Sequence, residues 1–210
     1  MTAVTNVSTV STSIGSVSTN PIVPVITSIT SYTASPGTAA SDSSIGTVAW
    51  VNPDNAKVSD NVYATASMTS GFPTESYSRY LKLTNFGFSI PTDSSIVGVQ
   101  VSVECKGASG DILDYVVKLV KGGVVVGDNE ARPDVEDNAV WPDMDEAILY
   151  PASGSEEDLW GISLSPSDVN ASDFGVVISC KNVSSSTRLA SVDYVSITVY
   201  ALAAGITNLT

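Results

Sequence analysis

The chain has 210 residues, with 9 Lys and Arg against 22 Asp and Glu, a formal net charge of −13 at pH 7, and no histidine. Proteins that bind nucleic acid rely on cations to neutralise phosphates, so this acidic balance argues against a nucleic-acid partner. The absence of histidine removes the usual general base of Ser-His-Asp and Cys-His nucleophile systems and most zinc sites. We therefore expect a protein that is not an enzyme and that carries no cofactor.

The length fits one domain of about 150 residues with an appendage, or a single large β-domain. No stretch reaches the roughly 18 consecutive apolar residues of a membrane-spanning helix, and the N-terminus lacks the cationic start and apolar block of a secretion signal. We expect no membrane partner and synthesis in a cytoplasm.

Residues 1–42 are poor in charge and rich in Ser, Thr and Val, and the first 56 residues contain no Lys or Arg. The apolar residues from Val4 to Val17 recur every three or four positions, which is a helical spacing. Ser, Thr and Val are middling or poor helix formers, however, and Pro21 and Pro24 interrupt the run, so we predict an extended arm. Such an arm cannot fold alone and needs a partner, which we expect it to bind through Val4, Val7, Val10, Ile14, Val17, Ile22, Val23, Val25, Ile26 and Ile29.

The end of this region has the composition of a strand followed by a linker. "PIVPVITSITSYTAS", residues 21–35, is β-branched and interrupted by proline, which suits an edge strand or a strand added to a partner's sheet. "SPGTAASDSS", residues 35–44, supplies turn and linker residues. We predict two parts, an arm and linker over 1–42 and a β-sandwich domain over 43–210.

Beyond residue 45, short apolar runs alternate with Gly, Pro, Asn and Asp. The clearest strand is "SIVGVQVSVECKG", residues 95–107, and "DYVVKLVKGGVVVG", residues 114–127, predicts a hairpin that turns at Gly122 and Gly123. "FGVVISCKN" and "VDYVSITVYAL" predict strands over 174–182 and 192–202, and weaker strands are expected near 46–51, 62–67, 79–85 and 187–191.

About eight strands without a long amphipathic helix predict an all-β fold, an antiparallel two-sheet sandwich of jelly-roll type. In the clearest strand we expect Val99, Val101, Val103 and Cys105 to face the core, and Gln100, Ser102, Glu104 and Lys106 to face solvent.

Several residues could carry chemistry, and each also has a structural interpretation. Cys105 and Cys180 could pair, but buried free thiols are the favoured interpretation. The acidic segment 128–146 could bind calcium, although it lacks the EF-hand pattern and is better explained as a solvated loop. Asp168 and Asp173 are favoured as turn formers over a glycosidase pair. The tryptophans could stack on sugars, but core anchoring is favoured; they are Trp50, Trp141 and Trp160.

Four segments in order give the chain a family resemblance. They are "WVNPDNAKVSDNVYATA", "YLKLTNFGFSIPTDSSIVGVQVSVECKG", "DLWGISLSPSDVNASDFGVVISCKN" and "VDYVSITVY". Together they resemble a β-sandwich module of virion structural proteins in tailed bacteriophages, over roughly residues 46–200. The likeness rests on framework residues, namely Trp50 to Ala56, Phe86 to Val99, Leu159 to Gly161 and Asp173 to Val176.

The resemblance implies a sandwich fold and a place in the virion, in head decoration or in tail and appendage proteins. Our leading expectation is a capsid decoration, or cement, protein on the outer capsid surface, synthesised in the host cytoplasm. Its arm would tie subunits of the major capsid protein together, and copies would form a homo-oligomer or symmetric array. The alternative is a tail or neck appendage whose sandwich binds host glycan; a secreted carbohydrate-binding module is disfavoured by the missing signal peptide.

Overall fold

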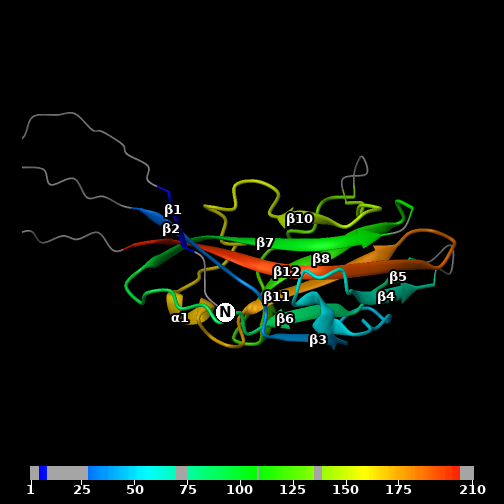
Figure 1. The fold of residues 1–210 in the computed structure, drawn as a ribbon, viewed down its shortest axis with the longest axis horizontal. Coiled ribbons are helices and arrows are strands. Elements are labelled where there is room, and N and C mark those ends of the chain that lie inside the picture. The colour runs from blue at the N-terminus through cyan, green and yellow to red at the C-terminus, as the bar shows by residue number, and fades with distance from the viewer. Residues whose placement is uncertain (1–4, 9–27, 70–74, 108, 135–138, 204–210) are drawn as a thin grey trace, which may run out of the picture.

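The computed structural model describes residues 5–8, 28–69, 75–107, 109–134 and 139–203 (Figure 1). Its strands form two antiparallel sheets that pack face to face, so the predicted all-β two-sheet sandwich is confirmed. Two short helices accompany the sheets in this part of the chain, the 3-10 helix η1 (Pro53–Ala56) and α1 (Pro166–Val169). No helix among the described residues has the length and apolar character that crossing a membrane requires.

The first sheet, sheet A, is built around the longest strand. Its order is β1 (Thr5–Ser8), β2 (Ile29–Ala34), β12 (Arg188–Leu202), β7 (Ser95–Gly107) and β10 (Glu146–Tyr150). β12 pairs with β7 from Ala190 opposite Gly107 to Leu202 opposite Ser95. Its other side is shared, because β2 pairs with residues 197–202 and β4 (Ala64–Met68) pairs with residues 188–192.

The second sheet, sheet B, has the order β3 (Thr38–Asp42), β6 (Tyr80–Thr84), β11 (Gly175–Asn182), β8 (Ile112–Lys121) and β9 (Val124–Val126). β5 (Ser76–Tyr77) pairs with the far end of β11. The β8–β9 hairpin turns at Gly122 and Gly123, whose φ angles of 59° and 76° are the positive values that a two-residue hairpin loop needs. This predicted hairpin is confirmed.

The core lies between the sheets and follows the alternation expected of half-buried strands. On β7, Val99, Val101, Val103 and Cys105 are fully buried, and the residues between them are partly exposed, as predicted. Facing them are inward residues of sheet B, among them Leu83, Val176 and Ile178. The tryptophans are also buried, which confirms their interpretation as core anchors.

The sheets begin earlier in the chain than the sequence analysis expected. Residues 29–42 were assigned to the arm and linker, whereas β2 pairs with β12 and β3 pairs with β6. The Gly and Pro of "SPGTAAS" form only the tight connection between these two strands, and the small residues after them fit an edge strand. The sandwich therefore starts at Ile29.

Three other expectations need correction. Residues 46–51 make only isolated bridges, at Val48 and Val51, and residues 187–191 are the start of β12 and not a separate strand. β10 was missed, because its five residues follow directly on the acidic segment and carry no strong alternation. Each error concerns a short stretch whose pairing partner is distant in sequence.

Both cysteines are buried free thiols, so the favoured interpretation of Cys105 and Cys180 is confirmed. Burial raises the pKa of the Cys180 thiol to about 12 and that of Cys105 well above its ordinary value. Neither thiol is ionised or accessible near neutral pH, which makes both of them inert core residues.

We predict that a thiol reagent such as DTNB leaves the native protein unmodified at pH 8 and labels both cysteines after denaturation in urea. Unfolded thiols ionise near their ordinary pKa, while the folded Cys180 stays neutral up to about 12. The free energy of unfolding should therefore fall as the pH rises from about 9 towards 12, which urea titrations at several pH values would measure. Rapid labelling of the native protein would contradict the buried placement.

Candidate functional site

The residues proposed to bind a partner fall mostly outside the described part of the chain. Val7 lies in β1, and Ile29 begins β2 with a partly buried side chain. Val4, Val10, Ile14, Val17, Ile22, Val23, Val25 and Ile26 lie outside the described residues. Their part in binding stays a prediction.

The described piece of the arm forms a strand at the edge of sheet A. In the antiparallel β1–β2 pair, Thr5 lies opposite Tyr32 and Ser8 opposite Ile29. The other side of β2 is paired with β12. The uncharged segment "TNVS" thus adds itself to a sheet edge through its backbone, which is the mode of contact that its composition predicts.

This edge lies at the end of the sandwich where two outer segments of the chain attach. The amide of Ala203 donates to the carbonyl of Ser28 at 3.4 Å, and β1, β2 and the C-terminal end of β12 lie together at that end (Figure 1). The segment before residue 28 and the segment after residue 203 therefore both connect to the same end of the molecule.

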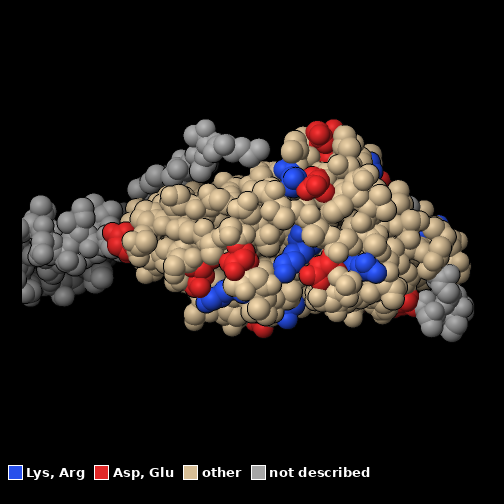
Figure 2. All heavy atoms as spheres, turned by 90° about the horizontal axis from the view of Figure 1, so that it is seen from below, with Lys and Arg blue, Asp and Glu red and all other residues tan. Residues whose placement is uncertain are grey.

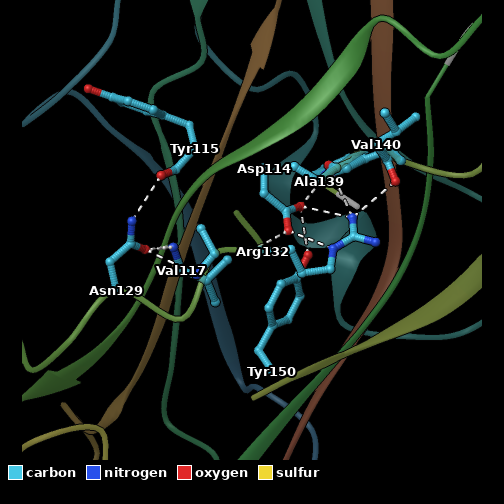
Figure 3. A network of polar contacts seen from close by, with 10 residues as sticks. Asp114, Tyr115, Val117, Asn129, Arg132, Ala139, Val140 and Tyr150 are labelled. Atoms are coloured by element: carbon cyan, nitrogen blue, oxygen red, sulfur yellow. Dashed lines mark hydrogen bonds and ion pairs between the residues drawn. The ribbon is translucent and has the colours of Figure 1, made fainter. Parts of the chain in front are cut away.

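The edge of β8 in sheet B, by contrast, is covered by the acidic segment. The amide of Asp114 donates to the carbonyl of Ala139 at 2.9 Å, and the amide of Trp141 donates to the carbonyl of Ile112 at 2.8 Å. Closer to the hairpin, the side-chain amide of Asn129 takes the place of a strand backbone. Its Oδ1 accepts from the amide of Val117 at 2.8 Å, and its Nδ2 donates to the carbonyl of Tyr115 at 3.1 Å (Figure 3). Backbone groups that would otherwise offer a pairing edge are satisfied within the chain.

A buried carboxylate holds this covering segment in place. Asp114 accepts hydrogen bonds from Nε of Arg132 at 2.8 Å, from Nε1 of Trp141 at 2.7 Å and from the hydroxyl of Tyr150 at 2.8 Å (Figure 3). Nη2 of Arg132 also donates to the carbonyls of Ala139 and Val140, at 3.2 and 3.1 Å. Burial and the nearby charge of Asp114 raise the pKa of Tyr150 well above its ordinary value, so its hydroxyl remains a donor.

The Asp114 network is a structural clamp. Both oxygens of the carboxylate are occupied by donors from the protein, and the Asp114 side chain is 1% exposed, so no position is open to a substrate. The network joins β8, the acidic segment and β10. A hollow of about 630 Å³ lies beside the network, and Arg132 is among the residues that line it. The guanidinium of Arg132 is already hydrogen-bonded to Asp114, so it is not free to bind a ligand there.

The other candidate residues also have structural roles. Trp50 and Trp160 are 4% and 0% exposed, and their indole nitrogens donate to the carbonyls of Arg79 and Val99, so their faces are not available to stack on sugars. Asp168 forms a capping box with Ser165 at the start of α1. This confirms the turn-forming interpretation of Asp168.

Sequence reasoning missed Asp114 and Arg132, the centre of the buried network. Asp114 was included in the predicted hairpin as an ordinary strand residue. Alternation with Val117 and Leu119 puts Asp114 on the outer face. It turns inward only because the β8–β11 register shifts between Ser179 and Cys180. The available signal was the single arginine in an otherwise acidic segment. That pattern is weak because it does not say which of the many acids is buried.

Comparisons of this chain with known protein families, with curated proteins and with solved structures find no match. The resemblance to phage virion modules therefore remains an expectation from the sequence.

We predict that Asp114→Asn destabilises the protein by about 3–5 kcal/mol, because it leaves the partly buried Arg132 guanidinium without a charged partner and points an amide donor at other donors in a buried site. Asp111→Asn is the matched control, since Asp111 pairs with Arg188 where both side chains are 25% exposed. It should cost no more than about 1 kcal/mol. Urea unfolding measures both values, and similar losses in the two variants would contradict the clamp.

Proposed function

We propose that this chain is a structural virion protein, a capsid decoration protein that binds the outer head surface. Its N-terminal arm would tie major capsid subunits together. The observation that supports this most directly is the β1–β2 pair, in which an uncharged Ser, Thr and Val segment forms a strand on a sheet edge. An arm that pairs in this way on its own sandwich has the chemistry to pair in the same way on a neighbouring subunit.

The proposed contact is strand exchange. β1 covers residues 29–32 of β2 within one chain, and an equivalent strand from a neighbour fits the same edge with the same backbone hydrogen bonds. At about 3.3 Å per residue, residues 1–27 can span at most about 90 Å, enough to reach an adjacent subunit. Many such contacts repeated by symmetry would multiply modest individual affinities.

Charge contributes little to this mode of binding. On the face shown in Figure 2, the described Lys and Arg side chains lie among Asp and Glu, with wide uncharged areas between them. Several described cations form ion pairs, as Lys181 does with Glu75 and Asp134. Backbone pairing and apolar contacts are thus the forces available to the arm.

We predict that a chain lacking residues 2–27 folds but no longer binds heads from which the protein has been stripped. The deletion must stop before Ile29, because β2 and β3 belong to the sheets. Circular dichroism and thermal unfolding would verify the fold, and co-sedimentation would measure binding. Undiminished binding of the truncated protein would contradict the proposal.

A disulfide lock provides a sharper comparison with the full chain. Val7 and Thr30 are directly opposite in the β1–β2 pair, so Val7→Cys with Thr30→Cys can join β1 to its own sheet. The oxidised monomer should not bind heads, and reduction should restore binding. If exchange occurs between copies, oxidation on the particle should give covalently linked chains on a non-reducing gel.

Copy number separates head decoration from the alternative, a tail or neck appendage that binds host glycan. Quantitative mass spectrometry of purified virions, with the major capsid protein as the internal standard, should find many copies of a decoration protein and few of an appendage. A glycan array should show no sugar preference if the proposal holds. Few copies together with a defined glycan ligand would favour the appendage.

A further inference from the structure

Three carboxylates from distant parts of the chain converge on the face of sheet A that points away from the core. Glu104 lies on β7, Asp145 directly precedes β10, and Asp193 lies on β12. One oxygen of each lies within 4.8 Å of the other two. Asp193 occupies the position where the β12–β7 register shifts, and its side chain is covered so completely that the residue is 1% exposed.

The protein supplies too few donors for these carboxylates. Among the described residues, Oδ1 of Asp193 accepts from the amide of Asp60 at 3.4 Å and Oδ2 from the amide of Asn61 at 3.1 Å, and no charged donor reaches either oxygen. Oδ2 of Asp145 accepts from the hydroxyl of Tyr63 at 3.0 Å, but its Oδ1 is fully enclosed and accepts no hydrogen bond within the described structure. An enclosed carboxylate oxygen without a donor is costly, because it has given up water and received nothing in exchange.

The three acids have no cation in direct contact among the described residues, since none of them takes part in an ion pair with a described Lys or Arg. Lys106 is the cation found beside the cluster, and its ammonium lies 3.8 Å from the centre of the Tyr63 ring. Three like charges held this close repel one another unless a positive charge lies between them.

We propose that Glu104, Asp145 and Asp193 bind a calcium ion. A cluster of carboxylate oxygens is the ligand set of a hard cation, and it holds no nitrogen or sulfur ligand that would favour zinc or copper. Calcium binds oxygen at about 2.3–2.6 Å, so ligands on opposite sides of the ion are about 5 Å apart, in keeping with the 4.8 Å limit of this cluster. Magnesium demands near-ideal octahedral geometry and usually keeps several of its waters, whereas calcium accepts irregular sets of carboxylate oxygens.

The ion would cross-link three segments of sheet A that are far apart in the sequence. Asp145 precedes the edge strand β10, Asp193 lies at the bulge of β12, and the amides of residues 60 and 61 bring the loop before β4 onto the same point. The site is separate from the arm, because its three acids lie on β7, on β12 and directly before β10, and not on β1 or β2.

Terbium, which occupies calcium sites, would test the proposal on the full chain after treatment with EDTA. We expect luminescence, sensitised by aromatic side chains such as Tyr63, that saturates at one ion per chain and is displaced by Ca²⁺. Asp193→Asn and Glu104→Gln should each weaken Ca²⁺ binding by at least tenfold. Glu157→Gln, which removes an exposed acid outside the cluster, is the matched control and should leave affinity unchanged.

Thermal unfolding gives a second measurement that does not depend on a variant losing its fold. Ca²⁺ should raise the Tm of the wild type and of Glu157→Gln, but not that of Asp145→Asn. In EDTA, Asp145→Asn should be at least as stable as the wild type, because it removes one of the repelling charges. The proposal is overturned if the folded wild type binds no Ca²⁺ at millimolar concentration, or if Glu157→Gln loses affinity as Asp193→Asn does.

Discussion

The long antiparallel pairing of β12 with β7 is the interaction on which the rest of this molecule depends. It fixes the register from residue 190 to residue 202 and places the inward residues of both strands in one continuous core layer. β2 and β4 pair with the other side of β12, and β10 pairs with the other side of β7, so these two long strands form the centre of sheet A. The same pair brings Glu104 and Asp193 to one point, through the bulge at which the register shifts.

Two edges of the sandwich are covered in different ways among the described residues. The acidic segment covers the β8 edge, fastened by Asp114 and by the side chain of Asn129. In the described part of the chain, the β2 edge is covered by the four-residue strand β1 of the arm. A covered edge protects against uncontrolled pairing, and under our proposal β1 exchanges and leaves the β2 edge to a partner.

The acidic residues of this chain have several different structural roles. Asp114 is buried and fully paired, Asp168 caps a helix, and Asp145 has an enclosed oxygen without a donor. A net charge of −13 therefore does not describe a uniformly solvated acidic surface. It includes carboxylates that the fold has placed for clamping, for capping and, as we propose, for holding an ion.

The sequence by itself determined the class of fold, the hairpin at Gly122 and Gly123, the buried face of β7, and the presence of strands at β11 and the later part of β12. Each depends on side-chain alternation or turn chemistry within a few neighbouring residues. Only the tertiary structure decided that β2 and β3 belong to the sheets, that Asp114 is the buried acid, and that Glu104, Asp145 and Asp193 meet. Those facts depend on which distant strands pair and in what register, and no local pattern carries that information because pairing energy is gained only between segments far apart in the chain.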